Sequence, residues 1–319
     1  MTRIEVPGAR AATPRSASHP SYGRRASACP ACGCRVRHPL FAPGGYRYVE
    51  CPGCGLAHLD PLPTDDEARA NFPDGYFAGA IPGGYDDYLA DEMLHRANAR
   101  ERLALLEQRG ARAPGRLLDV GCAHGFFLDE ACRAGWRGEG VEVSAGAAEF
   151  ARTRLGLDVT DDLAGVAAHQ PGAFDVITIF QVLEHVGSPA EMLGLARRCL
   201  RPSGTLVIET WDRSSLVARA LRSHWQDVAP PSVIWLFDRH SLGLLLGTAG
   251  FGAGEMHHTA KRVSMRFVAS LLDDHGGAFG PIGRAIRRSP LRERSFRYRL
   301  GDLVTVVATP AREAAAGAA

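Results

Sequence analysis

Short apolar runs alternate with helix-like stretches along the last two thirds of the chain. The runs lie at 117–120, 140–143, 175–180 and 205–209. Strands that alternate with helical patterns favour βαβ units and a parallel sheet. A late apolar run at 303–308 predicts a last strand. We therefore expect residues 115–310 to form one α/β domain.

Upstream of this domain the pattern changes twice. Residues 64–110 contain a piece rich in Gly, Pro and Tyr, followed by apolar residues at three- and four-residue spacing that end at Gly110. The predicted organisation is a disordered tail at 1–27, a cysteine module at 28–62, a helical linker at 63–114, the main domain at 115–310 with an insert at 211–241, and a disordered tail at 311–319.

Composition places the chain among ordinary globular proteins. Hydrophobic residues make up 45% of its 319 residues and charged residues 23%, which excludes disordered, collagen-like and coiled-coil classes for most of the length. No run approaches the ~18 apolar residues of a membrane span. The net charge of +2 gives no reason to expect a nucleic-acid partner. The N-terminus lacks the apolar region of a secretory signal, so we expect a cytoplasmic protein.

Five of the eight cysteines fall within one short segment. Cys29-Pro-Ala-Cys32-Gly and Cys51-Pro-Gly-Cys54-Gly are near-copies of one knuckle, and their C-x2-C-x18-C-x2-C spacing fits a zinc ribbon. Four thiolates complete a tetrahedron and leave no position for water, so the zinc is expected to be structural and remote from any chemistry. Two alternatives remain open: Cys34 could compete with Cys32, or the ribbon could have lost its metal.

A glycine loop follows the first apolar run of the main domain. Asp119-Val-Gly121-Cys-Ala-His-Gly125 predicts a strand, a tight turn and a helix start. Glu142 ends the next apolar run, where an acid can accept hydrogen bonds from both ribose hydroxyls of an adenosine. The loop is not the dinucleotide G-x-G-x-x-G, and the carboxylate of Asp119 suits a ligand with a cationic amine.

This loop resembles motif I of the class I (Rossmann-like) S-adenosylmethionine-dependent methyltransferases. Further segments follow in that family's order: 140–144, 161–163, 174–186 with its Leu-Glu-His-Val sequence, and 200–208 with Leu-Arg-Pro-Ser-Gly. The resemblance covers about residues 115–260. It implies a mostly parallel seven-stranded sheet with helices on both faces, preceded here by the small zinc-ribbon module.

The resemblance also implies S-adenosylmethionine as cofactor and suggests which residues contact it. The expected cofactor contacts are Asp119, Gly121, Cys122, Gly125, Glu142, Val143, Asp162, Leu163 and Phe180. Two alternatives stay open. Asp162, with its neighbour Asp161, could merely be a turn acid, and Cys122 could be a small buried hydrophobe.

The chain is most similar to ubiquinone-biosynthesis O-methyltransferases and their relatives in glycan and natural-product pathways. This subgroup implies methyl transfer to an oxygen of a small-molecule acceptor such as a sugar, polyketide or quinone. His185 is the first candidate base, because an imidazole with a pKa near 6.5 suits proton removal at cellular pH. His224 and His240 are second candidates, and Val233 stands where many members have a histidine. Residues 63–114 and the insert 211–241 are expected to fold over the site.

Several alternatives remain at this point. His185 could instead orient its loop or cap a helix, and the arginine-rich run 284–299 could be a solvated face or a clamp for an anionic substrate. The enzyme could be a C-methyltransferase of a sugar or natural product, or an RNA base methyltransferase. The chain could also be a cofactor-binding scaffold whose ribbon docks a carrier or partner protein.

Overall fold

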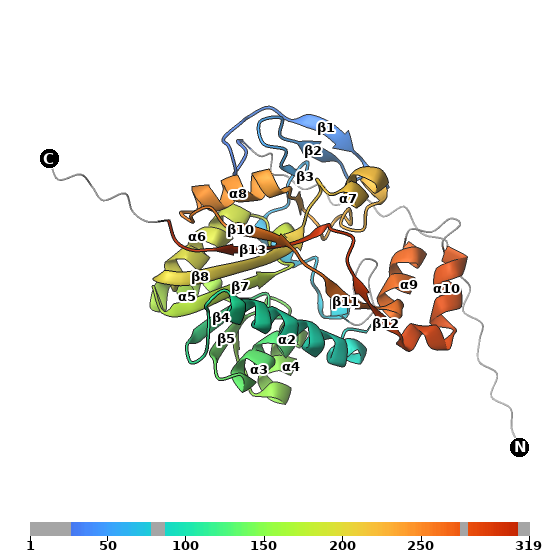
Figure 1. Ribbon diagram of the computed structural model, residues 1–319. Coiled ribbons are helices and arrows are strands. Elements are labelled where there is room, and N and C mark those ends of the chain that lie inside the picture. Colours follow the sequence, from blue (N-terminus) through green and yellow to red (C-terminus); the bar gives the residue numbers. More distant parts are fainter. Residues whose placement is uncertain (1–26, 78–86, 275–279, 312–319) are drawn as a thin grey trace, which may run out of the picture.

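The computed structural model describes residues 27–77, 87–274 and 280–311, and seven strands form its central sheet (Figure 1). Their spatial order is β10 (Glu255–His258), β13 (Leu303–Ala308), β8 (Leu200–Trp211), β7 (Phe174–Phe180), β4 (Arg116–Val120), β5 (Arg137–Val141) and β6 (Asp158–Thr160). Strands β8, β7, β4, β5 and β6 pair in parallel, whereas β13 runs antiparallel to both β8 and β10. The predicted mostly parallel sheet of seven strands is confirmed.

Helices cover both faces of this sheet, as predicted. One face packs against α2 (Glu92–Gln108), α3 (Phe126–Arg133) and α4 (Ala145–Leu155), and the other against α5 (Leu163–His169), α6 (Pro189–Cys199) and α8 (Arg239–Thr248). Neighbouring residues of one strand enter opposite cores: Leu117 joins the first and Leu118 the second. Because both faces are buried, the central strands β4 and β7 are largely apolar without a regular polar alternation.

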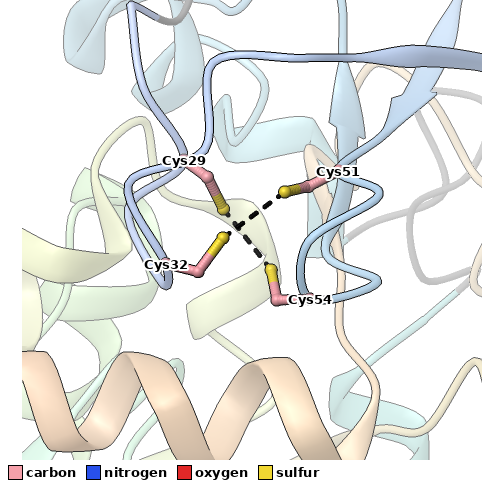
Figure 2. A group of neighbouring side chains, drawn as sticks. All are labelled: Cys29, Cys32, Cys51 and Cys54. Carbon is pink, nitrogen blue, oxygen red and sulfur yellow. Dashed lines mark hydrogen bonds between the residues drawn. The ribbon is translucent and has the colours of Figure 1, made fainter.

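The cysteine module forms a second, smaller sheet. Strands β1 (His38–Phe41), β2 (Tyr48–Glu50) and β3 (Ala57–Leu59) pair antiparallel, and the four paired cysteines gather beside them (Figure 2). A fourth strand, β9 (Trp235–Leu236), comes from the insert and pairs with β3. The sequence did not predict this strand, and it joins the module to the main domain.

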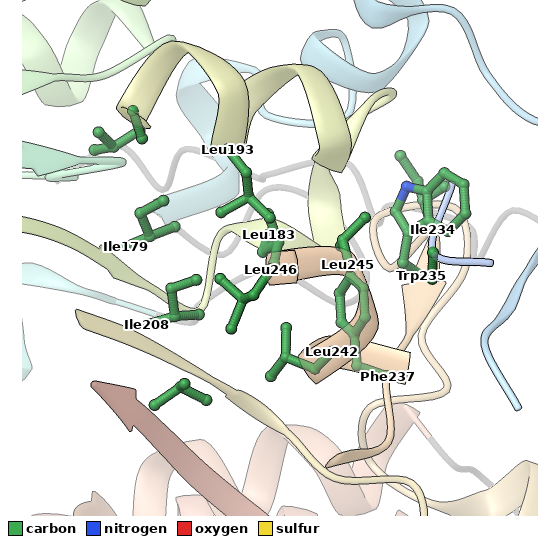
Figure 3. Packing of buried hydrophobic residues seen from close by; sticks show 14 of the residues in the cluster. Ile179, Leu183, Leu193, Ile208, Ile234, Trp235, Phe237, Leu242, Leu245 and Leu246 are labelled. Carbon is green, nitrogen blue, oxygen red and sulfur yellow. The ribbon is translucent and has the colours of Figure 1, made fainter. Parts of the chain in front are cut away.

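The insert contributes to the main core as well. It contains α7 (Leu216–Leu221) and β9, and its Ile234 and Trp235 pack near Leu183 and Leu245 (Figure 3). Ile234 and Leu245 are both fully buried. The ribbon, the insert and the helix-covered sheet therefore share one hydrophobic cluster.

A small lobe is inserted between β10 and β13. It consists of a two-stranded sheet of β11 (Lys261–Ser264) and β12 (Ser295–Tyr298), with α9 (Met265–Asp274) and α10 (Gly280–Arg287) beside it (Figure 1). The linker before the main domain includes the short helix α1 (Asp65–Arg69), which begins in a capping box between Thr64 and Glu67. Most of the two predicted tails, and 78–86 of the predicted lid, lie outside the described residues. No helix of the described part is both long and apolar enough to span a bilayer.

Candidate functional site

A cavity of about 1220 Å³ lies at the carboxyl ends of the parallel strands. Val120, Val141 and Phe180, at the ends of β4, β5 and β7, form its floor. Ligands of doubly wound sheets bind at this edge. The remaining walls come from the cysteine module at 43–46, the linker at 65–77 and 88–102, the loops after β6 and β7, the insert at 223–233 and the lobe at 261–271. The linker and the insert therefore both face the cavity.

The loop after β4 is tied to the acid after β5. Glu142 is buried and accepts hydrogen bonds from the backbone N–H of Ala123 and of Ser144, each at 2.8 Å. Burial raises the pKa of Glu142. The hydrogen bonds from the Ser144 and Ala123 N–H groups lower it, but burial has the larger effect. Each carboxylate oxygen still has a second lone pair, so the cavity-lining side chain can accept bonds from ribose hydroxyls. The residues present fit the adenosine part of S-adenosylmethionine.

Two glycines of the loop have different tasks. Gly121 lines the cavity with φ +77°, and an added Cβ would lie 2.2 Å from Cγ2 of Val182. Gly125 has φ +82° and precedes α3, and its added Cβ would lie 2.5 Å from Cδ1 of Leu157. Gly121 therefore makes room for Val182 at the cavity wall, whereas Gly125 makes room for Leu157 at the start of α3, and both adopt a left-handed backbone that favours glycine.

Six of the nine predicted cofactor residues line the cavity. They are Gly121, Glu142, Val143, Asp162, Leu163 and Phe180. Asp119, Cys122 and Gly125 lie behind the wall, which corrects their expected direct contact. Asp119 is buried and accepts a hydrogen bond from Thr178 Oγ1 at 2.7 Å, and burial raises its pKa to about 7. It can support the loop from below but is not itself part of the wall.

Asp162 has a structural role besides lining the cavity. Its side chain caps α5 by accepting a hydrogen bond from the Gly165 backbone N–H at 2.8 Å. The cap holds in place the start of α5, where Asp162 and Leu163 line the cavity. The turn-acid alternative therefore describes part of what this side chain does.

His185 lies in the short helix η4 (Leu183–His185) directly after β7 and lines the cavity. Its Nδ1 is 2.7 Å from the Ser232 carbonyl oxygen. A carbonyl can only accept, so Nδ1 carries the proton and Nε2 keeps its lone pair. Burial lowers the pKa of His185 to about 4, so the ring is neutral at cellular pH. The pKa of His185 therefore lies below the value of about 6.5 of an unperturbed imidazole.

The two second-choice histidines differ in placement. His224 lines the cavity from the insert. His240 is exposed in the first turn of α8 and is not part of the cavity wall. The capping box between Asp238 and Ser241 sets the start of this helix, with Ser241 turned into the core and His240 outward. The structure therefore removes His240 from the candidate bases.

The acceptor side of the cavity holds charged residues that sequence reasoning missed. Glu184 and Asp227 are 1% and 6% exposed, and Lys261 at the start of β11 lies near both. Burial raises the pKa of Glu184 to about 7 and that of Asp227 well above its usual value. Burial also lowers the pKa of Lys261 to about 8. Glu184 and Lys261 can therefore change charge close to neutral pH.

Lys261 is held by a chain of polar contacts. Its Nζ donates to Gln181 Oε1 at 2.8 Å, and Gln181 Nε2 donates to Glu209 Oε1 at 2.8 Å. Glu209 also forms an ion pair with Arg102. Burial alone would raise the pKa of Glu209, but the Arg102 guanidinium and the neighbouring donors together lower it. One signal for this cluster was present in the sequence: Lys261 is the only lysine in the chain.

The arginine-rich run does not reach the cavity. No described residue of 284–299 lines it, and the run lies on α10, the following turn and β12. Arg297 forms an ion pair with Glu101, and Arg292 with Glu293. The run therefore does not form a clamp for a substrate in this cavity.

The four paired cysteines form one cluster. Their sulfur atoms all lie within 4.8 Å of one another, with Cys29–Cys54 and Cys32–Cys51 separations of 3.5 Å. A disulfide would need about 2.0 Å. Sulfurs on a zinc tetrahedron with bonds of about 2.3 Å lie about 3.8 Å apart, so the cluster fits zinc. Cys34 is not part of the cluster, and its competition with Cys32 is not supported.

Comparisons with known proteins agree with this site. The family model described as "Methyltransferase domain" matches residues 90–253, just over half of the chain. The ubiquinone biosynthesis O-methyltransferase of Thiobacillus denitrificans is 33% identical over 128 residues, which cover 38% of this chain and 55% of that protein. The Xanthomonas campestris pv. campestris protein of the same name is 30% identical over 182 residues, or 50% and 76% of the two chains. The chain spans about half the length of the first of these relatives.

A solved structure shares the fold. It is a chain of the complex between the Haloferax volcanii Trm112 methyltransferase activator and a methyltransferase, with a TM-score of 0.52 and 16% identity. The match covers 78% of this chain and 98% of that one. At this identity it shows the fold alone. With the family model, the sheet order and the loops after β4 and β5 in agreement, the chain belongs to the class I S-adenosylmethionine-dependent methyltransferases.

Proposed function

We propose that this enzyme methylates an oxygen of a small-molecule acceptor, with His185 as the base. The observation that carries the proposal is the fixed His185 ring. Its Nδ1 is bonded to the Ser232 carbonyl, which leaves the Nε2 lone pair available in a cavity whose other end holds Glu142. The similarity to proteins named ubiquinone biosynthesis O-methyltransferase supports oxygen as the acceptor atom.

The cofactor end is built from the loops after the first strands. We expect Glu142 to bind the ribose hydroxyls, and Asp162 and Leu163 to border the adenine. Gly121 lets the loop approach the ligand, and Phe180 packs edge-on against Phe127 at 4.9 Å between ring centroids, which holds it at the cavity floor. When bound, S-adenosylmethionine supplies a methyl group on a cationic sulfur.

The chain's own contribution is to position the acceptor and take its proton. The acceptor O–H proton moves to Nε2 of His185 as the oxygen forms its bond to the methyl carbon. S-adenosylmethionine, held by Glu142 and the loop after β4, would supply the methyl group and keep the electron pair of the broken carbon–sulfur bond on its sulfur. Positioning of the reacting atoms contributes roughly 7–11 kcal/mol in such reactions, and a base roughly 100- to 10,000-fold in rate.

The acceptor is expected to be a sugar, polyketide, quinone or related metabolite. Buried Glu184 and Asp227 offer hydrogen-bonding groups to a polar acceptor, and the described cavity wall is not dominated by cations. This charge pattern argues against an RNA base as acceptor. Methylation at carbon would use the same base. Thiolate ligands for zinc need reducing conditions, in keeping with the cytoplasm. Docking of a carrier or partner protein on the ribbon stays a prediction.

The test compares histidine variants in single-turnover methyl transfer. An acceptor is first found by screening metabolites for release of S-adenosylhomocysteine. We expect His185→Ala to lower the rate roughly 100- to 10,000-fold with nearly unchanged cofactor affinity. His169→Ala, exposed on α5, is the matched control and should keep the wild-type rate.

The pH profile gives a second check. Because the base must be neutral, the His185-dependent rate should be full above about pH 5 and fall as pH drops through about 4. If His185→Ala keeps the wild-type rate and the same low-pH limb, His185 is not the base, and His224 becomes the candidate.

A further inference from the structure

Residues 232–236 of the insert lie between the cysteine ribbon and the loop that carries His185. On the ribbon side, β9 pairs with β3 through His58 and Trp235. The Leu59 backbone N–H donates to the Ile234 carbonyl at 2.9 Å. Tyr48 of β2 donates its hydroxyl to the Val233 carbonyl. Val233 and Ile234 are thus hydrogen-bonded to the ribbon, and Trp235 is the strand partner of His58.

The other side of the same segment is bonded to the candidate catalytic loop. The Ile234 backbone N–H donates to the Glu184 carbonyl at 2.8 Å, and Trp235 Nε1 donates to the Val186 carbonyl at 2.8 Å. The Ser232 carbonyl accepts from His185 Nδ1. Ile234 is therefore bonded through its N–H to the loop and through its C=O to the ribbon.

The segment has little room to move. Val233, Ile234 and Trp235 are 4%, 0% and 2% exposed. The packing of Ile234 and Trp235 beside the core is visible in Figure 3. A shift of the ribbon would therefore be passed to the His185 loop, because close-packed interiors transmit strain.

The cysteine cluster sits at the start of this path. The backbone N–H groups of Cys51 and Gly55 bond to the Leu56 and Cys51 carbonyls, each at 2.8 Å, and β3 begins directly after this knuckle. A zinc ion bound by all four cysteines would fix the position of the second knuckle. Because β3 begins directly after this knuckle, the ion would also fix β3.

We propose that the metal-held ribbon positions His185 for catalysis, with Tyr48 as a positioning residue in the path. The proposal rests on His185 being the base of the proposed function. It replaces the expectation that the metal is remote from the chemistry. Loss of zinc should release the Ser232 carbonyl from His185 and let the ring rotate, while Glu142, whose side chain is held by the Ala123 and Ser144 backbone N–H groups, keeps its cofactor.

The test measures the tautomer and the pKa of the His185 ring directly by NMR, and it needs no methyl acceptor. The protein carries 15N-labelled histidine, and the His185 signals are those missing from His185→Gln. In zinc-loaded wild type we expect a single tautomer with the proton on Nδ1 and no titration above about pH 5. After chelation we expect mixed tautomers and a pKa that rises towards about 6.5.

Variants show whether His185 depends on the position of the ribbon or only on the ribbon being folded. Tyr48→Phe removes one bond in the path and leaves all four cysteines, so it should bind zinc and S-adenosylmethionine normally yet show mixed His185 tautomers. Its turnover, once an acceptor is known, should fall roughly 10- to 100-fold, part of what a base contributes. His38→Ala is the control, because His38 is exposed on β1, at the ribbon edge away from β9.

The outcomes are distinguishable from failure of the proposed function. An unchanged His185 tautomer in chelated protein that still binds cofactor overturns the inference. If chelation also abolishes cofactor binding, Tyr48→Phe decides: normal His185 signals there overturn it. A zinc-dependent tautomer with no methyl transfer to any acceptor would leave the coupling intact and refute the proposed function.

Discussion

Replacing Glu142 by alanine tests the cofactor end of the site. The side chain lies at the end of β5, and its two oxygens hold the Ala123 and Ser144 backbone N–H groups while facing the cavity. Removing it deletes the proposed ribose acceptor. A hydrogen bond to a charged group contributes about 1.5–3 kcal/mol, so the dissociation constant for S-adenosylmethionine should rise roughly 10- to 150-fold.

The same substitution leaves the Ala123 and Ser144 N–H groups without their partner. Each buried unsatisfied group costs about 1–3 kcal/mol, so the free energy of unfolding should fall as well. Affinity is therefore measured by calorimetry under conditions where the variant is folded, and stability separately by urea unfolding. This separation distinguishes a lost ligand contact from a loosened loop.

Glu139→Ala is the matched control. Glu139 lies on the same strand, pairs with Arg116 and does not line the cavity. It should lose some stability but keep wild-type cofactor affinity. Equal affinity of wild type and Glu142→Ala, or an equal loss in Glu139→Ala, would refute the assignment of Glu142 to the ribose.

The remaining predictions concern the lysine, the core and the metal. Lys261 is the only lysine, so reductive 13C-methylation labels it and the N-terminal amine alone; its NMR titration should show a pKa near 8, and a value above 10 would mean that it is not buried among the cavity groups. Leu193→Ala, at a fully buried position, should lower the free energy of unfolding by about 2–5 kcal/mol, whereas Leu216→Ala, 83% exposed, should change it by less than about 0.5 kcal/mol. Elemental analysis should find one zinc per chain, unchanged in Cys34→Ser; a metal-free protein purified without chelator would contradict the site.

The central sheet could be predicted because its strands are buried on both faces. β7, residues 206–208 of β8 and most of β13 are apolar, since burial of both faces removes polar alternation. The positions of Gly121 and Glu142 at the cavity follow from this topology, because consecutive parallel strands end at one edge.

The pairing of the ribbon with the insert could not be predicted. β9 has two residues, too few for a periodic signal, and Trp235 pairs with His58 from a distant part of the chain. Without knowledge of this pairing, the ribbon is expected to be an independent metal-binding module. For this reason the sequence analysis predicts a zinc site far from the chemistry.

The charged acceptor side escaped prediction for a related reason. Glu184, Asp227 and Lys261 come from three separate segments, and only the folded chain brings them to one cavity. Their pKa values depend on burial, which sequence does not report. The histidines show the same limit, since His185 is fixed by a carbonyl of the insert while His240 is turned outward by a helix cap.

Transfer of a labelled methyl group is the most direct test of the proposed O-methylation. The zinc-loaded protein is incubated with S-adenosylmethionine carrying a trideuterated methyl group and with a panel of phenols, sugars, quinols and polyketides, and the products are analysed by mass spectrometry. We expect one acceptor class to gain the trideuterated methyl on oxygen, with a matching amount of S-adenosylhomocysteine, and we expect His185→Ala to lose this product. Normal cofactor binding without transfer to any of these acceptors, or transfer that persists at the wild-type rate in His185→Ala, would contradict it.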